Sequence, residues 1–122
     1  MAKHNQTGLA GEELAVEYLE KKGWVTLVRN FRFGRAEIDV ISKDGEIPVF
    51  VEVKTLSSNN FGFPEEAVDA AKRKNIALAA QGWIEENEYE GEIRFDIVAI
   101  TLNGKESPQI HHITDAFFPG IE

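Results

Sequence analysis

The chain has 122 residues, of which 43% are hydrophobic and 28% are charged, and its formal net charge is −8. This length fits a single domain, residues 1–122, with a core of its own, and the composition is ordinary for a globular protein. Because the sequence contains no cysteine, disulfides, thiolate metal sites and cysteine nucleophiles are excluded. Residues 1–7 are polar, and no apolar run approaches the roughly 18–20 residues that span a bilayer, so we expect a cytoplasmic protein without a membrane partner.

The negative charge is distributed unevenly along the chain. Residues 1–74 carry 11 Lys and Arg against 12 Asp and Glu, whereas residues 75–122 carry 2 against 9. An acidic protein is a poor general ligand for nucleic acid, because phosphates attract basic surfaces. The first part nevertheless contains Arg29, Arg32, Arg35 and the run Lys72–Lys74. If a metal offsets several carboxylates there, we expect one face to be locally positive.

The hydrophobic pattern predicts a small α/β domain. Residues 7–22 repeat apolar side chains at helical spacing, with Thr7 as a candidate N-cap and Gly23 as the stop. A second helical stripe covers residues 65–87. The predicted strands are 24–30, 36–42, 49–55, 94–101 and a short edge strand at 109–113. The order α-β-β-β-α-β predicts helices packed on a mixed sheet.

The most informative segment is the hairpin expected around Asp44-Gly45, a dipeptide typical of tight turns. If the strands pair symmetrically about this dipeptide, Ile38 lies opposite Val51 and Glu37 lies opposite Glu52. Because side chains alternate between the two faces of a strand, this pairing predicts one apolar and one charged face. The apolar face consists of Ile38, Val40, Val49, Val51 and Val53, and the charged face consists of Glu37, Asp39, Glu52 and Lys54.

The charged face has the composition of a site for a hard divalent cation. Glu37 directly opposite Glu52 is destabilising unless another group compensates for the repulsion. Asp39 and Glu52 are predicted diagonal neighbours with backbones about 7–8 Å apart, so both carboxylates can converge on one ion. Such ligands suit Mg²⁺, Mn²⁺ or Ca²⁺ rather than Zn²⁺, and Lys54 would reach a water or phosphate beside the ion. The same alternation is also typical of any half-exposed hairpin, so both interpretations stay open.

Glu12 is a candidate third acid. At 100° per residue along the first predicted helix it lies within the apolar arc, whereas the polar side carries Glu13, Glu17 and Glu20. A carboxylate on a buried stripe is costly unless it is paired or bound to a cation. Convergence on Asp39 and Glu52 would explain its position. An edge position at which Glu12 reaches solvent or pairs with an Arg would explain it equally well.

Four segments in order resemble the small bacterial YraN family. They are Gly11–Ala15 with Tyr18-Leu19, Ala36–Asp39, Phe50–Lys54 and Arg94–Asp96. The pattern of Asp39, 12 residues, then Glu52-Val53-Lys54 resembles the core signature of the PD-(D/E)XK nuclease superfamily. The resemblance covers about residues 8–118 and implies a restriction-endonuclease-like fold, similar to that of archaeal Holliday-junction resolvases.

The resemblance also implies roles for the matching residues. Glu12, Asp39 and Glu52 match the family's metal-binding acids, which would hold Mg²⁺ or Mn²⁺, and Asp39, Glu52 and Lys54 form the implied catalytic set. Glu37 and Lys72 fall on further motif positions with supporting roles. The implied reaction is metal-assisted hydrolysis of phosphodiester bonds in DNA, in particular branched or structured DNA. Because a symmetric junction needs two active sites, the analogy favours a homodimer.

Two other interpretations of function stay open. The acidic surface, and Leu56 where family members often carry a basic residue, favour a nucleic-acid-binding or protein-interaction module that does not cut. Alternatively, the acidic segment 85–92 docks a basic partner protein.

Other polar residues are given structural interpretations. Two interpretations are open for Asp96, within the strand 94–101. It contacts and orients Lys54 or another basic residue of the site, or it forms a structural salt bridge. The histidines are expected on the surface or in loops, because none has the spacing of a site; they are His4, His111 and His112. The run Lys72–Lys74 is either a phosphate-contact patch or a solvated helical face.

Overall fold

The computed structural model describes residues 3–57, 68–102 and 107–117. The helices are α1 (Lys3–Lys21) and α2 (Ala70–Glu86). The strands are β1 (Val25–Phe33), β2 (Ala36–Asp44), β3 (Ile47–Ser57), β4 (Arg94–Leu102) and β5 (Gln109–Ile113). They form one sheet in the order β1-β2-β3-β4-β5, in which β3 and β4 are parallel and the other neighbours are antiparallel. The predicted α/β class, element order and mixed sheet are confirmed.

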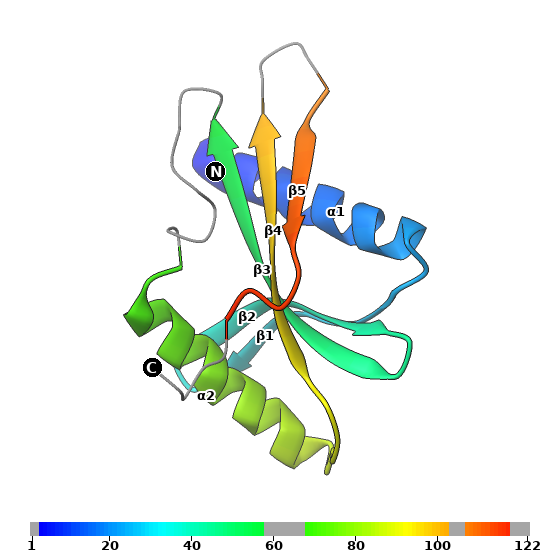
Figure 1. Cartoon of the computed structure of the whole chain (residues 1–122). Coiled ribbons are helices and arrows are strands. Elements are labelled where there is room, and N and C mark those ends of the chain that lie inside the picture. The colour runs from blue at the N-terminus through cyan, green and yellow to red at the C-terminus, as the bar shows by residue number, and fades with distance from the viewer. Residues whose placement is uncertain (1–2, 58–67, 103–106, 118–122) are drawn as a thin grey trace.

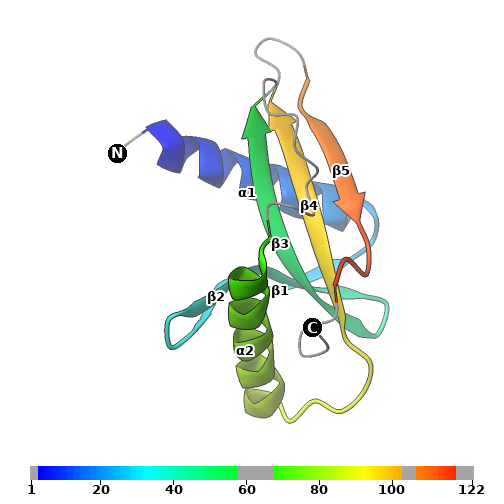
Figure 2. The same ribbon diagram turned by 60° about the vertical axis from the view of Figure 1, so that its left-hand side comes forward.

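The two helices pack on opposite faces of the sheet. α1 lies across β3, β4 and β5, whereas α2 lies beside β1 and β2 (Figures 1 and 2). Consecutive residues of β3 show the division, since Val49 packs in the cluster under α1 and Phe50 packs in the cluster under α2. This arrangement explains why β3 is apolar on one set of alternate positions and mixed on the other.

The core is divided into two clusters by the sheet. The cluster under α1 contains Ala15, Val16, Leu19, Trp24, Val40, Val49, Val51, Val98 and Ile100. Phe50, Ile76, Trp83, Phe95 and Ile97 belong to the cluster under α2. Ile38 also belongs to the α2 cluster, so its predicted position on the same face as Val40 is wrong. The alternation along β2 is interrupted between these two residues, at Asp39.

The helix starts differ from those predicted. α1 begins at Lys3, so Thr7 lies inside the helix and its interpretation as an N-cap is wrong. α2 begins at Ala70 rather than at residue 65, and residues 65–67 lie outside the described part of the chain. Asp69 is its N-cap, because the carboxylate accepts a hydrogen bond from the backbone N–H of Lys72 at 2.9 Å. This cap fixes the start of α2, and with it the position of Lys72.

The register of the β2–β3 hairpin differs by two residues from the predicted one. Val40 lies opposite Val51, and Asp44 lies opposite Ile47, so the turn consists of Gly45 and Glu46. Gly45 has φ +62°, which suits a glycine at the first central position of a two-residue hairpin turn. The predicted pairing of Glu37 with Glu52 is therefore wrong. Asp39 and Glu52 are nevertheless neighbours, because the Asp39 carboxylate accepts a hydrogen bond from the backbone N–H of Val53, the residue after Glu52.

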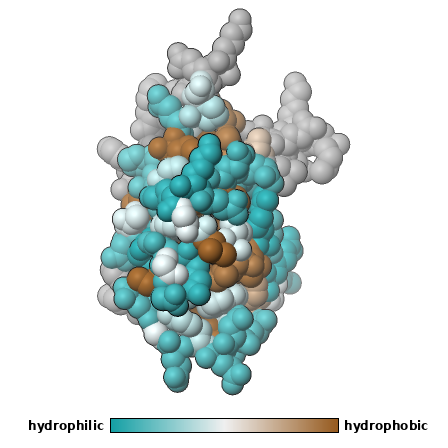
Figure 3. Space-filling view, turned by 90° about the vertical axis from the view of Figure 1, so that its right-hand side faces the viewer, coloured by the Kyte–Doolittle hydropathy of each residue, from teal (hydrophilic) through white to brown (hydrophobic). Residues whose placement is uncertain are grey.

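Figure 3 shows the side of the molecule on which α1 ends and β5 lies. Hydrophilic residues cover most of this face, and hydrophobic residues are exposed there in small areas. Scattered apolar exposure of this kind is ordinary for a protein surface.

Candidate active site

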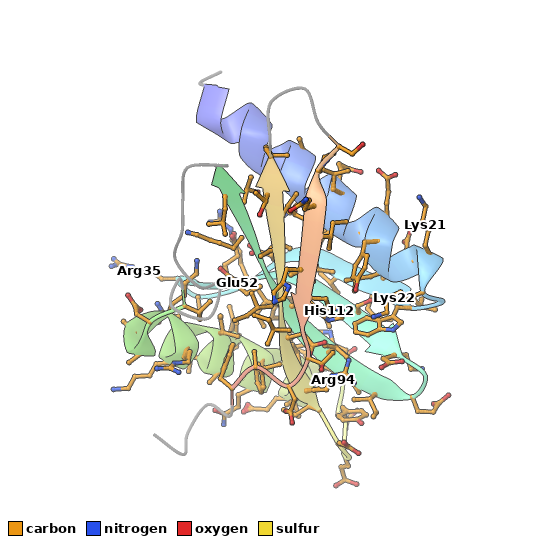
Figure 4. The ribbon with its side chains drawn as sticks, turned by 45° about the horizontal axis from the view of Figure 1, so that its top comes forward. Lys21, Lys22, Arg35, Glu52, Arg94 and His112 are labelled. Atoms are coloured by element: carbon orange, nitrogen blue, oxygen red, sulfur yellow. The ribbon has the colours of Figure 1, made fainter. Side chains whose placement is uncertain are left out.

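Asp39 and Glu52 meet where the pairing of β2 with β3 ends. The Asp39 carboxylate accepts a hydrogen bond from the backbone N–H of Val53 at 2.8 Å, which places it beside Glu52. The Glu52 side chain is only 5% exposed and lies on the same side of the sheet as α2 (Figure 4). The sequence prediction that folding brings these two acids together is therefore supported by geometry, although their register differs from the predicted one.

The surroundings of the pair disfavour the ionised form of Asp39. Burial and the neighbouring Glu52 carboxylate raise the pKa of Asp39 from 3.8 to about 7. The hydrogen bond from Val53 and the charge of Lys72 act in the opposite direction without cancelling the effect. A cation placed between the two carboxylates would relieve this repulsion.

Lys72 supplies a positive charge to the pair from α2. Its Nζ lies 2.5 Å from Glu52 Oε2. Burial by itself would lower the pKa of Lys72, but the hydrogen bond and charge of Glu52 and the charge of Asp39 raise it overall. The structure thus brings Lys72, which the sequence only assigned a supporting role, into direct contact with the acid pair.

Lys54 lies two residues beyond Glu52 on β3. The β3–β4 register places Glu52 beside Ile97 and Lys54 beside Ala99. Glu52 and Lys54 are two residues apart in the same strand, so their side chains lie on the same face of the sheet. Lys54 is half-buried and forms no ion pair within residues 3–57, 68–102 and 107–117. Its ammonium is therefore available to a group that enters the site.

Glu12 lies on α1, close enough to the pair to interact electrostatically. Burial and the charge of Asp39 raise the pKa of Glu12. Its Oε1 accepts a hydrogen bond from Asn30 Nδ2 at 3.1 Å and lies 3.6 Å from Arg29 Nη2. The pairing of Glu12 with an arginine, one of the two interpretations drawn from the helical wheel, is present, whereas its convergence with Asp39 and Glu52 on an ion stays a prediction.

A close approach of α1 to β3 determines where Glu12 lies. A Cβ added to Gly11 would lie well under 3.0 Å from Thr55 Oγ1. Only a residue without a side chain allows the helix to pack this near to β3. Gly11 in the first motif is explained by this contact.

The donor set is suited to a hard divalent metal. Asp39 and Glu52 present carboxylate oxygens, the ligands preferred by Mg²⁺ and Mn²⁺, and burial together with the charge of Glu52 raises the pKa of Asp39. In the described ranges, no three acidic or histidine side chains lie together as a ready-made metal site. The assignment of Glu12 as a third ligand thus stays a prediction. Glu37 instead pairs with Arg32 across β1 and β2, at 3.0 Å.

A second polar cluster lies on the α1 face of the sheet, centred on Asp96. This fully buried carboxylate accepts hydrogen bonds from Arg94 Nε at 2.9 Å, Arg94 Nη2 at 3.0 Å and the backbone N–H of Asp115 at 3.0 Å. His112 Nε2 lies 2.8 Å from Asp96 Oδ2. Burial by itself would raise the pKa of Asp96, but the hydrogen bonds from His112 and Arg94 outweigh burial and lower it. Figure 4 shows Arg94 and His112 near each other, away from Glu52.

This cluster decides between the two interpretations of Asp96 and corrects that of His112. Asp96 is the register partner of Val51, which packs under α1, so it lies on the opposite face from Lys54 and forms a structural salt bridge. The His112 side chain is only 4% exposed, and the expectation of a surface or loop histidine is wrong. Its ring packs edge-on against Tyr18 and Trp24. The alternation of side chains along β5 could have predicted that His112 points inward. It could not have predicted that Asp96 of β4 is the partner of His112.

The fold and site together define an α/β chain with a restriction-endonuclease-like arrangement, in which a central strand carries Glu52 and Lys54 beside Asp39. Residues 11–100 match the Uncharacterised protein family UPF0102. The chain belongs to this family, which confirms the resemblance found in the four sequence segments.

Relatives in several bacteria match over nearly the full chain. A UPF0102 protein of Christiangramia forsetii is 45% identical over 118 residues, covering 97% of this chain and 98% of that protein. A UPF0102 protein of Geobacter metallireducens is 44% identical over 119 residues, covering 96% and 97%. One of Rhodococcus opacus is 41% identical over 118 residues, covering 96% and 100%. Neither of the two helices, as far as they are described, is long and apolar enough to cross a membrane.

Proposed function

We propose that this protein is a Mg²⁺- or Mn²⁺-dependent nuclease that hydrolyses phosphodiester bonds in DNA. The observation that carries the proposal is the adjacent pair of half-buried Asp39 and buried Glu52, with Lys54 two residues further along β3. Two adjacent carboxylates that repel each other form a poor structural element but a suitable pair of metal ligands.

Each residue has a defined part in this chemistry. Asp39 and Glu52 would hold the metal, with Glu12 as a third ligand. The bound metal would supply a Lewis acid that activates water and stabilises charge on the phosphate. Lys54 would position or deprotonate the attacking water and offset negative charge that develops on the phosphate oxygens. The hydrogen bond from Val53 to Asp39 holds one ligand in place before the substrate arrives.

Branched or structured DNA is the substrate class suggested by the resemblance to junction resolvases. A symmetric junction has two strands to cut, and this symmetry favours a homodimer with one site in each copy. Bacterial chromosomal DNA lies in the cytoplasm, so the proposal places the protein there.

Cleavage assays test this function. The native chain, with Mn²⁺ or Mg²⁺ at low salt, is incubated with branched, single-stranded and duplex DNA. We expect cleavage that chelation abolishes and that Lys54→Ala reduces by roughly 10²-fold or more. Lys43→Ala is the matched control, because Lys43 faces the exposed Glu46 at the far end of β2. Activity that survives unchanged in Lys54→Ala would contradict the proposed role of this site.

A module that binds without cutting is the second candidate. The net charge of −8 and Leu56 on β3 favour it, because both reduce the attraction of phosphate to the site. Calorimetric titration of Mn²⁺ separates the two candidates. The nuclease requires a site that Asp39→Ala removes, whereas equal titrations of the native chain and this variant would favour the module.

A further inference from the structure

Glu52 forms an ion pair with a lysine of α2 in this structure. The Lys72 ammonium contacts Glu52 Oε2, while the Glu52 side chain is 5% exposed and the Lys72 side chain is 44% exposed. A carboxylate this buried is costly unless it is paired, so the lysine stabilises the acid pair as it stands. The same carboxylate oxygen belongs to the pair that the proposed function assigns to a metal.

The lysine and a divalent metal cannot both occupy this position. Lys72 is a single charge on a flexible stem, and its partly exposed side chain has room to leave the pair. A divalent ion brings twice the charge to the same oxygens and repels the ammonium. Because the lysine stem is flexible, the ammonium can leave Glu52 while the backbone at the start of α2 stays held by the Asp69 cap.

We propose that Lys72 is an internal counter-ion of the Asp39–Glu52 pair, which a divalent metal must displace, and that this competition sets the metal affinity of the site. The inference rests on the proposed metal site and deepens it. It requires two opposite effects when the ammonium is removed. The metal-free protein loses stability because Glu52 is left buried without a partner, and the metal binds more tightly because its competitor is gone.

The test is calorimetric titration of MnCl₂ into the native chain, Lys72→Met and Lys74→Met. Lys74 is the matched control, since it is exposed on the same helix and its loss changes the net charge equally. We expect Lys72→Met to tighten the Kd for Mn²⁺ about tenfold, which corresponds to ~1.4 kcal/mol. Lys74→Met should change the Kd less than about twofold, because a solvated charge at a distance is screened. Thermal unfolding should show a lower Tm for metal-free Lys72→Met and a larger rise on adding Mn²⁺.

A second variant keeps the test decisive if Lys72→Met does not fold. Lys72→Arg retains the positive charge, and the planar guanidinium can donate two parallel hydrogen bonds to the Glu52 carboxylate. This competitor is harder to displace, so Mn²⁺ should bind more weakly than to the native chain. Weaker binding to Lys72→Met, or a Kd equal to that of Lys74→Met, would overturn the counter-ion role while leaving the metal site intact. Failure of the native chain and all three variants to bind Mn²⁺ would overturn the metal site and this inference together.

Discussion

The carboxylate of Asp39 accepts a hydrogen bond from the backbone N–H of Val53, at 2.8 Å. Val53 is the residue between Glu52 and Lys54, so a side chain of β2 holds the segment of β3 that carries the other two proposed active-site residues. The contact lies just beyond the last register pair of the two strands, Val40 and Val51. Asp39 thus continues the attachment of β2 to β3 after the pairing of their backbones ends.

The first prediction concerns the pH dependence of stability. Burial and Glu52 raise the pKa of Asp39 from 3.8 to about 7, so the folded chain resists an ionisation that the unfolded chain undergoes near pH 4. The stability contributed by this group is therefore greatest below the unfolded pKa and falls as the pH rises toward 7. Without metal, Asp39→Asn should gain about 2–4 kcal/mol relative to the native chain between pH 4 and pH 8.

Urea unfolding in the presence of a chelator measures this difference at both pH values. Glu46→Gln is the control, because the Glu46 side chain is 96% exposed and its variant should follow the native curve. A constant offset between Asp39→Asn and the native chain across this range would contradict the prediction.

The second prediction concerns the contact of Gly11 with Thr55. Gly11→Ala places a methyl group against Thr55 Oγ1, so α1 must move away from β3. We expect the variant to lose about 1–3 kcal/mol of unfolding free energy, which exceeds the gain of ~1 kcal/mol in helix propensity. Thr55→Ala should restore most of the loss, whereas Thr55→Val, which keeps the side-chain volume, should not. Equal effects of Gly11→Ala in all three backgrounds, measured by urea unfolding, would argue against this contact.

The third prediction concerns the buried carboxylate of Asp96. Asp96→Asn removes the buried charged partner of Arg94 and leaves this arginine with Asp44 alone, and we expect a loss of about 3–5 kcal/mol at neutral pH. Because hydrogen bonding outweighs burial and lowers the pKa of Asp96, its stabilisation is present above the unfolded pKa and is lost as the pH falls through the lower folded value. Unfolding of native and variant chains should therefore converge in acid.

Asp115→Asn is the matched control for this experiment. Asp115 is exposed, and only its backbone N–H contacts Asp96. Its variant should stay within about 0.5 kcal/mol of the native chain at neutral pH. A comparable loss in both variants would show that Asp96 does not have the special role assigned to it.

The fourth prediction concerns Gly82 on α2 and Phe33 at the end of β1. A Cβ at Gly82 would lie well under 3.0 Å from the Phe33 ring, which is 39% exposed. Gly82→Ala should therefore destabilise the native chain by about 1–2 kcal/mol, because the ring must leave its position on the helix. In a Phe33→Ala background the same change should stabilise by up to ~1 kcal/mol, since only helix propensity remains. A double-mutant cycle by thermal unfolding tests this reversal of sign.

Local sequence patterns were sufficient for the elements and for much of the candidate site. The 3.6-residue and two-residue periodicities predicted both helices and all five strands, including the exact start of β5 at Gln109. Alternation placed Glu52 and Lys54 on one face of β3 because that property depends only on strand geometry. Alternation did not by itself place Asp39 near Glu52, because the predicted register was wrong by two residues and the alternation of β2 is interrupted at Asp39.

The tertiary structure decided everything that depends on contacts between distant segments. Lys72 reaches Glu52 because the capped start of α2, which packs on β2, brings the lysine to β3, and His112 reaches Asp96 because β5 pairs with β4. Glu12 contacts Arg29 and is close enough to Asp39 to feel its charge, because α1 approaches β3 closely at Gly11. Periodicity shows which way a side chain points from its own element. It does not show which residue of another element lies there, because that choice is made by the packing of the whole core.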